Sequence, residues 1–158
     1  MGGVKDIDRG WKKIKEEIKL IDNSFVNVGV LSDSGGYAAS EGGINLADVA
    51  TFNEFGTSRI PPRPFMRQTF EKNNKKTTDF ISKQKDLIYQ GKETTRGALE
   101  TIGVFYQGKI QTEFNEGNFK ANAPATIRQK TVNGNVGDRP LHDTGRLKQS
   151  INFEVKIK

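Results

Sequence analysis

The chain has 158 residues, 34% of them hydrophobic and 28% charged, which suits one domain with a lean core that gains stability from neighbouring subunits. It contains no cysteine, which excludes disulfides and thiolate metal sites. Its formal net charge of +6 is concentrated in residues 61–158, and this basic part suits either solvent or an acidic protein or nucleic-acid partner.

The first elements are predicted from hydrophobic periodicity. Apolar residues spaced by three or four positions run from Ile7 through Trp11 to Ile21 and predict an amphipathic helix. Residues 25–31 read FVNVGVL, and their alternating valines predict a strand with one buried face. Residues 32–43 contain four glycines and almost nothing to bury, so a long mobile loop is expected.

A short helix and a stiff connector are predicted next. Asn45 or Asp48 is suited to cap a helix that ends near Gly56. The connector that follows contains three prolines, Pro61, Pro62 and Pro64, and proline fixes the backbone and excludes helix. We therefore predict a rigid proline-rich arm over residues 56–64.

Two long helices are predicted after the connector. The first spans residues 65–89, and its polar middle, residues 72–79, predicts that it leaves the core there. The second spans residues 92–116, with a stripe of small residues at Gly97, Thr101, Val104 and Gly108. That stripe either admits a close neighbour or is a run of poor helix formers.

The C-terminal part predicts short helices and a strand. Residues 124–130 suit a short helix, and Asp143 or Thr144 is suited to cap a final helical turn over residues 146–149. The ending INFEVKIK alternates strictly between apolar and polar residues, which predicts a strand with one buried face. The fold class is therefore α+β, a small mostly antiparallel sheet packed by an N-terminal helix and two long helices, with long mobile loops and a single domain over residues 1–158.

The residue types that carry enzyme chemistry are sparse. The single histidine, His142, offers too few ligands for a metal. Asp143-Thr144-Gly145 matches the aspartic-protease signature, but such enzymes need two aspartates that share a proton. There is no glycine-rich phosphate loop. We expect no enzymatic activity, no cofactor and no metal.

Two segments resemble a known protein family. Residues 53–57 read NEFGT and residues 60–67 read IPPRPFMR, similar to the EFGT…P-x-R-P-F-[LM]-R segment of tail-component and neck proteins of tailed phages. Residues 124–130 read PATIRQK and residues 140–151 read PLHDTGRLKQSI, which resembles the T-I-x-x-K…P-L-x-D-T-G-x-L-x-x-S-I ending of the phage virion-morphogenesis, or tail-completion, family. The order and spacing of these motifs also match.

The resemblance implies a structural virion protein of a tailed bacteriophage, a prophage or a phage-tail-like particle. Related proteins form rings, commonly sixfold, at the top of the tail or in the neck. The implied partners are other copies of the chain, in a hexameric ring, and neighbouring neck, connector or tail-tube proteins. Weak contact with genomic DNA in the ring lumen is also implied, whereas no membrane partner is expected. Synthesis in the host cytoplasm would precede incorporation into the virion.

The motifs also supply candidate interface residues. An aromatic residue flanked by arginines is typical of an interface hot spot, and a rigid segment loses little entropy on docking. The candidates are Phe55, Arg59, Arg63, Phe65, Arg67, Asp143 and Arg146. The alternative is that Phe55 and Phe65 close the core of the domain itself.

A second hypothesis for the function is a DNA-binding accessory protein that uses the basic C-terminal half. Nucleic-acid binding is indicated by basic residues interleaved with aromatic ones. The segment that comes nearest runs from Arg59 to Phe70. The same arginines suit a protein interface, where arginine is enriched.

Overall fold

The computed structural model describes residues 9–31, 43–134 and 138–158. In chain order the elements are α1 (Trp11–Ile21), β1 (Phe25–Val30), α2 (Leu46–Phe55), α3 (Phe65–Tyr89), α4 (Thr95–Glu116), α5 (Pro124–Val132), α6 (Arg146–Gln149) and β2 (Ile151–Lys156). The loop predicted at residues 32–43 lies, apart from Gly43, outside the described residues, as does Ile7 of the first predicted helix. Every helix and strand expected from the sequence is present within a few residues of its predicted bounds.

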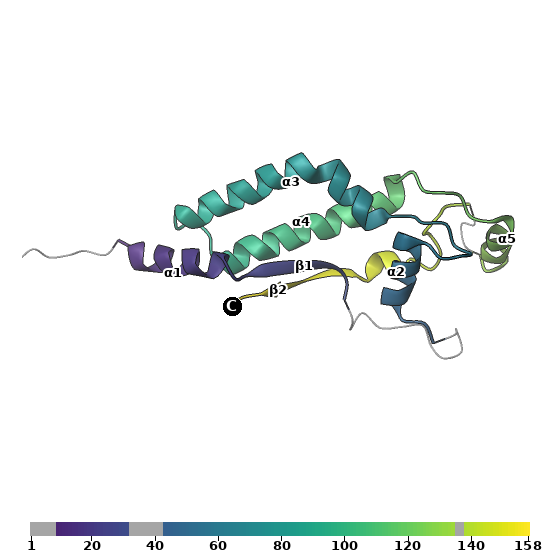
Figure 1. The fold of residues 1–158 in the computed structure, drawn as a ribbon, viewed down its shortest axis with the longest axis horizontal. Coiled ribbons are helices and arrows are strands. Elements are labelled where there is room, and N and C mark those ends of the chain that lie inside the picture. Colours follow the sequence, from purple (N-terminus) through teal and green to yellow (C-terminus); the bar gives the residue numbers. More distant parts are fainter. Residues whose placement is uncertain (1–8, 32–42, 135–137) are drawn as a thin grey trace, which may run out of the picture.

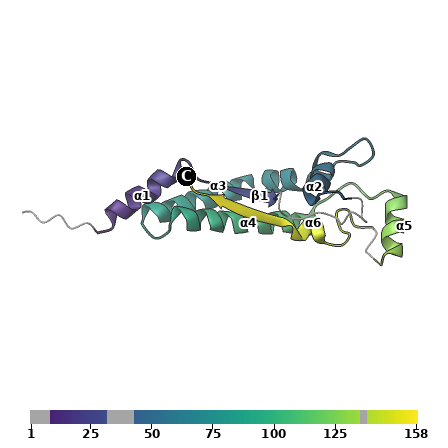
Figure 2. The same ribbon diagram turned by 90° about the horizontal axis from the view of Figure 1, so that it is seen from below.

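The two strands and the two long helices form three layers (Figures 1 and 2). β1 and β2 pair antiparallel, with Phe25 opposite Lys156 and Val30 opposite Ile151. α4 packs against both strands, and α3 packs against α4. α1 lies at one end of this stack, whereas α2, α5 and α6 lie at the other end. The predicted α+β class, with its antiparallel sheet and covering helices, is confirmed.

The sheet and α4 approach closely at one glycine. A Cβ atom at Gly103 would collide with the ring of Phe153, which projects from β2. The predicted stripe of small residues is not this contact, because Val104 is 57% exposed and nothing lies within 4 Å of a Cβ built at Gly108. The sequence stripe therefore marks a solvent face of α4, and the close approach uses a glycine on a neighbouring face.

The prediction that α3 leaves the core in its middle is wrong. Thr77 is buried there, and its hydroxyl oxygen accepts a hydrogen bond of 2.7 Å from the Tyr106 hydroxyl of α4. Phe80 of α3 stacks on Phe105 of α4 with 4.6 Å between ring centroids. Polar residues stay in this helix interface because they find partners across it, which hydrophobic periodicity alone does not reveal.

Phe65 is a core residue, which corrects its place among the interface candidates. Its side chain is 0% exposed, and its ring centroid lies 4.7 Å from that of Phe114 in α4. Buried residues of α2, α4, α6 and β2 surround it, including Ala50, Ile110 and Ile151. Phe65 opens α3 just where α3 joins the core, and so it faces inward.

The proline-rich segment does not project as an arm. The Arg63 backbone N–H donates to the Asn53 carbonyl at 2.6 Å, and the Thr57 N–H donates to the Ile60 carbonyl at 2.8 Å. These bonds return residues 56–64 onto the end of α2. The prolines thus fix a compact connection between α2 and α3.

In the part of the chain that the structure describes, no helix combines the length and the apolar character that a bilayer span requires.

We expect Phe65→Ala to lower the free energy of unfolding by about 3–5 kcal/mol, because it opens a cavity in a fully packed site. Urea denaturation of the isolated protein measures this. Phe55→Ala is the matched control, since Phe55 is 67% exposed and its truncation should cost under about 0.5 kcal/mol. Equal losses in the two variants would contradict the assignment of Phe65 to the core.

Candidate functional site

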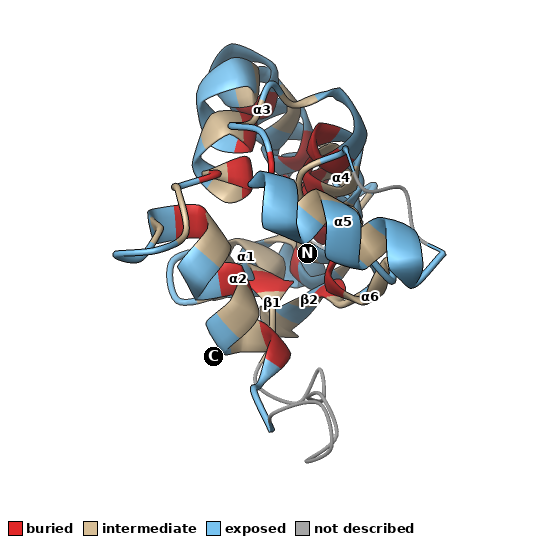
Figure 3. Cartoon of the chain, turned by 90° about the vertical axis from the view of Figure 1, so that its right-hand side faces the viewer, coloured by how far each residue is buried: buried red, intermediate tan, exposed pale blue. Residues whose placement is uncertain are grey.

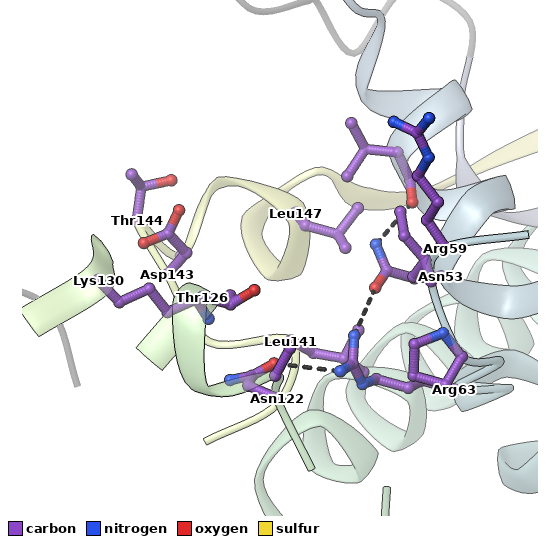
Figure 4. Close-up of a pocket in the computed structure, with 15 residues that line it drawn as sticks. Asn53, Arg59, Arg63, Asn122, Thr126, Lys130, Leu141, Asp143, Thr144 and Leu147 are labelled. Atoms are coloured by element: carbon purple, nitrogen blue, oxygen red, sulfur yellow. Dashed lines mark hydrogen bonds between the residues drawn. The ribbon is translucent and has the colours of Figure 1, made fainter. Parts of the chain in front are cut away.

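The two motif segments, far apart in sequence, meet at one end of the molecule. The first segment forms the end of α2, the connector and the start of α3, and the second forms α5, α6 and the chain between them. Together they line a cavity of about 280 Å³ (Figure 4). Its polar lining residues include Asn53, Arg59, Arg63, Thr126, Lys130 and Asp143.

Arg63 ties the connector to the segment that follows α4. Its Nε donates to the Lys120 carbonyl at 2.9 Å, and its Nη2 donates to the Ala121 carbonyl at 3.2 Å and to Asn122 Oδ1 at 3.1 Å. Its Nη1 donates to Asn53 Oδ1 at 3.5 Å. The side chain is buried, and burial lowers the pKa of the guanidinium from its ordinary value. Arg63 is therefore an internal cross-link, which corrects its place among the interface candidates.

The cross-link continues into the second motif. Asn122, itself buried, donates from Nδ2 to the Arg139 carbonyl at 3.1 Å. Farther along, Lys130 of α5 donates to the His142 carbonyl. The His142 Nε2 atom lies 2.8 Å from the Phe114 carbonyl at the end of α4. Hydrogen bonds thus hold the second motif against both α4 and the connector.

The surroundings of the Lys130 ammonium shift its pKa in opposite directions. Burial lowers the pKa of Lys130, the Asp143 carboxylate raises it, and the Arg63 guanidinium lowers it. The net direction is downward from the ordinary value. Asp143 is thus the local counter-charge for Lys130 on one side of the cavity.

Glu54 has a structural role at this end of the molecule that sequence reasoning missed. It is buried at the end of α2, and its carboxylate accepts hydrogen bonds of 2.9 Å from the backbone N–H groups of Met66 and Arg67. These N–H groups belong to the first turn of α3, where Pro64 provides no side-chain cap. The motif glutamate therefore caps a helix from outside it, in the position where a negative charge also meets the positive end of the helix dipole. The sequence signal for this cap was a glutamate that stands before a Phe-Gly turn and a helix that begins after a proline.

Gly56 explains why the motif needs glycine. Its φ is +78°, and an added Cβ would lie 2.9 Å from the Pro62 nitrogen and 3.0 Å from the Ile60 carbonyl oxygen. Only glycine allows the chain to leave α2 at this angle and fold back on itself.

The predicted caps are partly corrected. Asn45 caps α2 as expected, because its side chain accepts from the Ala47 N–H at 3.0 Å. α6, however, begins after Gly145, which has a left-handed backbone and no side chain to cap the helix. Thr144 Oγ1 accepts a long hydrogen bond of 3.5 Å from the Arg146 N–H. The glycine turn therefore sets the start of α6, and Thr144, one of the two predicted caps, adds a weak bond to its first N–H.

The other interface candidates differ in exposure. Phe55, Arg59, Arg67 and Asp143 are exposed, and Arg146 is half-buried. The Arg67 guanidinium lies over the Phe55 ring, 5.9 Å from its centroid. Arg59 and Asp143 instead line the cavity between the motifs. Six of the seven candidates therefore separate into buried residues (Arg63 and Phe65), a Phe55–Arg67 pair and cavity residues (Arg59 and Asp143), and Arg146 belongs to none of these groups.

The Phe55–Arg67 pair borders a second hollow of about 330 Å³, with Ala47, Thr51 and Met66 also in its wall. Two further large apolar side chains are exposed on or next to α2, Ile44 at 42% and Phe52 at 40%. We call Ile44, Phe52 and Phe55 the α2 patch. Figure 3 views this end of the molecule, where blue marks exposed residues.

The described residues bring together no group of three or more histidine, cysteine or acidic side chains that could hold a metal ion. The arrangement at this end offers hydrogen-bonding, cationic and apolar groups.

No family model, curated protein or solved structure matches this chain. The motif resemblance and the geometry of the motif end are therefore the basis for a functional proposal.

We expect Arg63→Lys to lower the free energy of unfolding by about 2–3 kcal/mol, because a lysine cannot reproduce the guanidinium fork and leaves buried acceptors unpaired. Urea denaturation measures the loss. Arg59→Lys makes the same change at an exposed arginine and is the control. It should leave the free energy of unfolding nearly unchanged. A neutral Arg63→Lys variant would show that the cross-link adds nothing to stability.

Proposed function

We propose that this chain is a structural subunit of a tailed-phage virion, or of a related tail-like particle, and forms a ring that completes the neck or tail during head–tail joining. The motif resemblance supplies the class of protein. The geometry of the motif end supports it, because some motif residues (Glu54, Arg63 and Phe65) are buried and fix the backbone, whereas others (Phe55 and Arg59) are exposed. We call the buried set the framework.

The observation that carries the proposal is the position of Phe55. Its neighbours on both sides are fixed, since the Glu54 carboxylate binds α3 and Gly56 makes a turn that only glycine allows. Phe55 between them is 67% exposed. An aromatic side chain held outward on a rigid backbone loses little entropy when a partner covers it.

The α2 patch extends this surface. Single exposed apolar residues are normal on a protein, but Ile44, Phe52 and Phe55 gather at one short helix. A closed ring needs two different, complementary faces on every subunit. The α2 patch supplies one of them.

We expect Phe55→Ala to abolish ring formation and particle completion while leaving the free subunit folded, because truncating a central aromatic typically costs about 2 kcal/mol or more per contact. A closed ring repeats that loss in every subunit. The measurement pairs thermal melting of the free subunit with electron microscopy of particles made when only the variant is supplied.

Val104→Ala is the matched control, since Val104 is 57% exposed on α4, away from the α2 patch. Particles with the Val104 variant should be complete. Normal particles with Phe55→Ala, or normal particles in the absence of the protein, would overturn the proposal. Heads without tails, tails without heads or tails of uncontrolled length would each assign a different position in the virion.

The alternative of a DNA-binding accessory protein has one structural observation in its favour. α3 carries exposed lysines along its length, among them Lys75, Lys76, Lys83 and Lys85. Gel-shift assays with duplex DNA at low and physiological salt separate the two functions. Tight binding that persists at physiological salt would favour the accessory protein, whereas contact in a ring lumen should be weak and salt-sensitive.

A further inference from the structure

The cavity between the motifs contains one cationic side chain that takes no part in the hydrogen bonds that hold this end of the molecule together. Arg59 is exposed, and among the residues that the structure describes its guanidinium has no hydrogen-bond or ion-pair partner. The other cavity cations are engaged, because Arg63 donates to the 120–122 segment and Lys130 donates to the His142 carbonyl beside Asp143. Arg59 is therefore the charge left for a ligand.

Figure 4 shows how these charges are divided. Arg59 and Arg63 lie on one side of the cavity, whereas Lys130 lies with Asp143 and Thr144 on the opposite side. Among the described lining residues Asp143 is the only carboxylate. An anion beside Arg59 would lie away from Asp143.

Part of the remaining lining is apolar. Val49, Ile60, Pro61, Leu141 and Leu147 contribute to the wall of the same cavity. A cation beside an apolar wall fits an acidic side chain with apolar neighbours better than it fits a nucleic-acid backbone, which is contacted by rows of exposed cations.

We propose that this cavity binds a carboxylate side chain from an acidic, apolar-flanked segment of a different virion protein adjacent to the ring. This inference rests on the proposed function for the presence of such a neighbour. A second copy of this chain is a poorer source, because each copy carries a formal net charge of +6 and like-charged surfaces repel.

The test uses two fluorescein-labelled peptides, Gly-Leu-Glu-Leu-Glu-Leu-Gly and its counterpart with glutamine in place of glutamate. The full-length protein should bind the glutamate peptide, measured by fluorescence anisotropy, and bind the glutamine peptide at least about tenfold more weakly, the factor expected for one charge-assisted hydrogen bond. Arg59→Gln should weaken binding of the glutamate peptide by a similar factor. Lys75→Gln removes the same charge from an exposed position on α3, and it should change binding less than about twofold.

The location of binding is read from backbone amide shifts, which should be largest at Asn53, Arg59 and Ile60, the lining residues on the Arg59 side of the cavity. Four outcomes would overturn the inference. They are absence of binding at protein concentrations of about 1 mM, equal binding of the two peptides, equal loss in the two variants, and displacement of the peptide by a short duplex DNA at equimolar concentration.

A second readout separates this inference from the proposed function. In particles, Arg59→Gln should leave rings of normal size that fail to attach to their neighbour, whereas Phe55→Ala should prevent the rings themselves. Peptide binding at the cavity in a protein that is absent from particles would sink the proposed function and leave the cavity assignment standing. Normal rings without peptide binding would overturn the inference about the cavity and leave the proposed function standing.

Discussion

The buried guanidinium of Arg63 is the interaction on which the motif end depends. Burying a charge is unfavourable unless hydrogen bonds replace its water, and here the carbonyls of Lys120 and Ala121 and the side chain of Asn122 do so. These acceptors belong to a segment without regular structure between α4 and α5. The arginine thus gives that segment a fixed position relative to α2 and α3.

The other buried motif residues extend this framework. The Glu54 carboxylate joins the end of α2 to the first turn of α3. Asn122, which accepts from Arg63, itself donates a hydrogen bond to the Arg139 carbonyl. The polar residues of the motifs therefore fix the backbone. Phe55 and Arg59, which lie between the fastened points, remain exposed and are the groups with which we propose that the subunit recognises its neighbours.

How much the sequence could predict depended on the kind of signal. Strict alternation identified β2, and three-to-four spacing identified α1, because one buried face leaves a periodic trace. The stiff connector was also predicted, but not its direction, since prolines fix local angles without saying what lies beside them. For that reason Arg63 was assigned to a surface and Phe65 was left open between a surface and the core, although both are buried. Gly103 and Glu54 were missed because their roles are set by residues distant in sequence, Phe153 and the start of α3.

The central claim is that Arg63 couples the connector to the segment after α4, and a double-mutant cycle between Arg63→Met and Asn122→Ala tests it most directly. Unfolding in urea gives the free energies of the wild type, both single variants and the double variant. We predict a coupling energy of about 1–3 kcal/mol, within the range of about 0.5–3 kcal/mol found for residues in one hydrogen-bond network. Additive losses, with a coupling below about 0.5 kcal/mol, are what independent sites show and would contradict the claim.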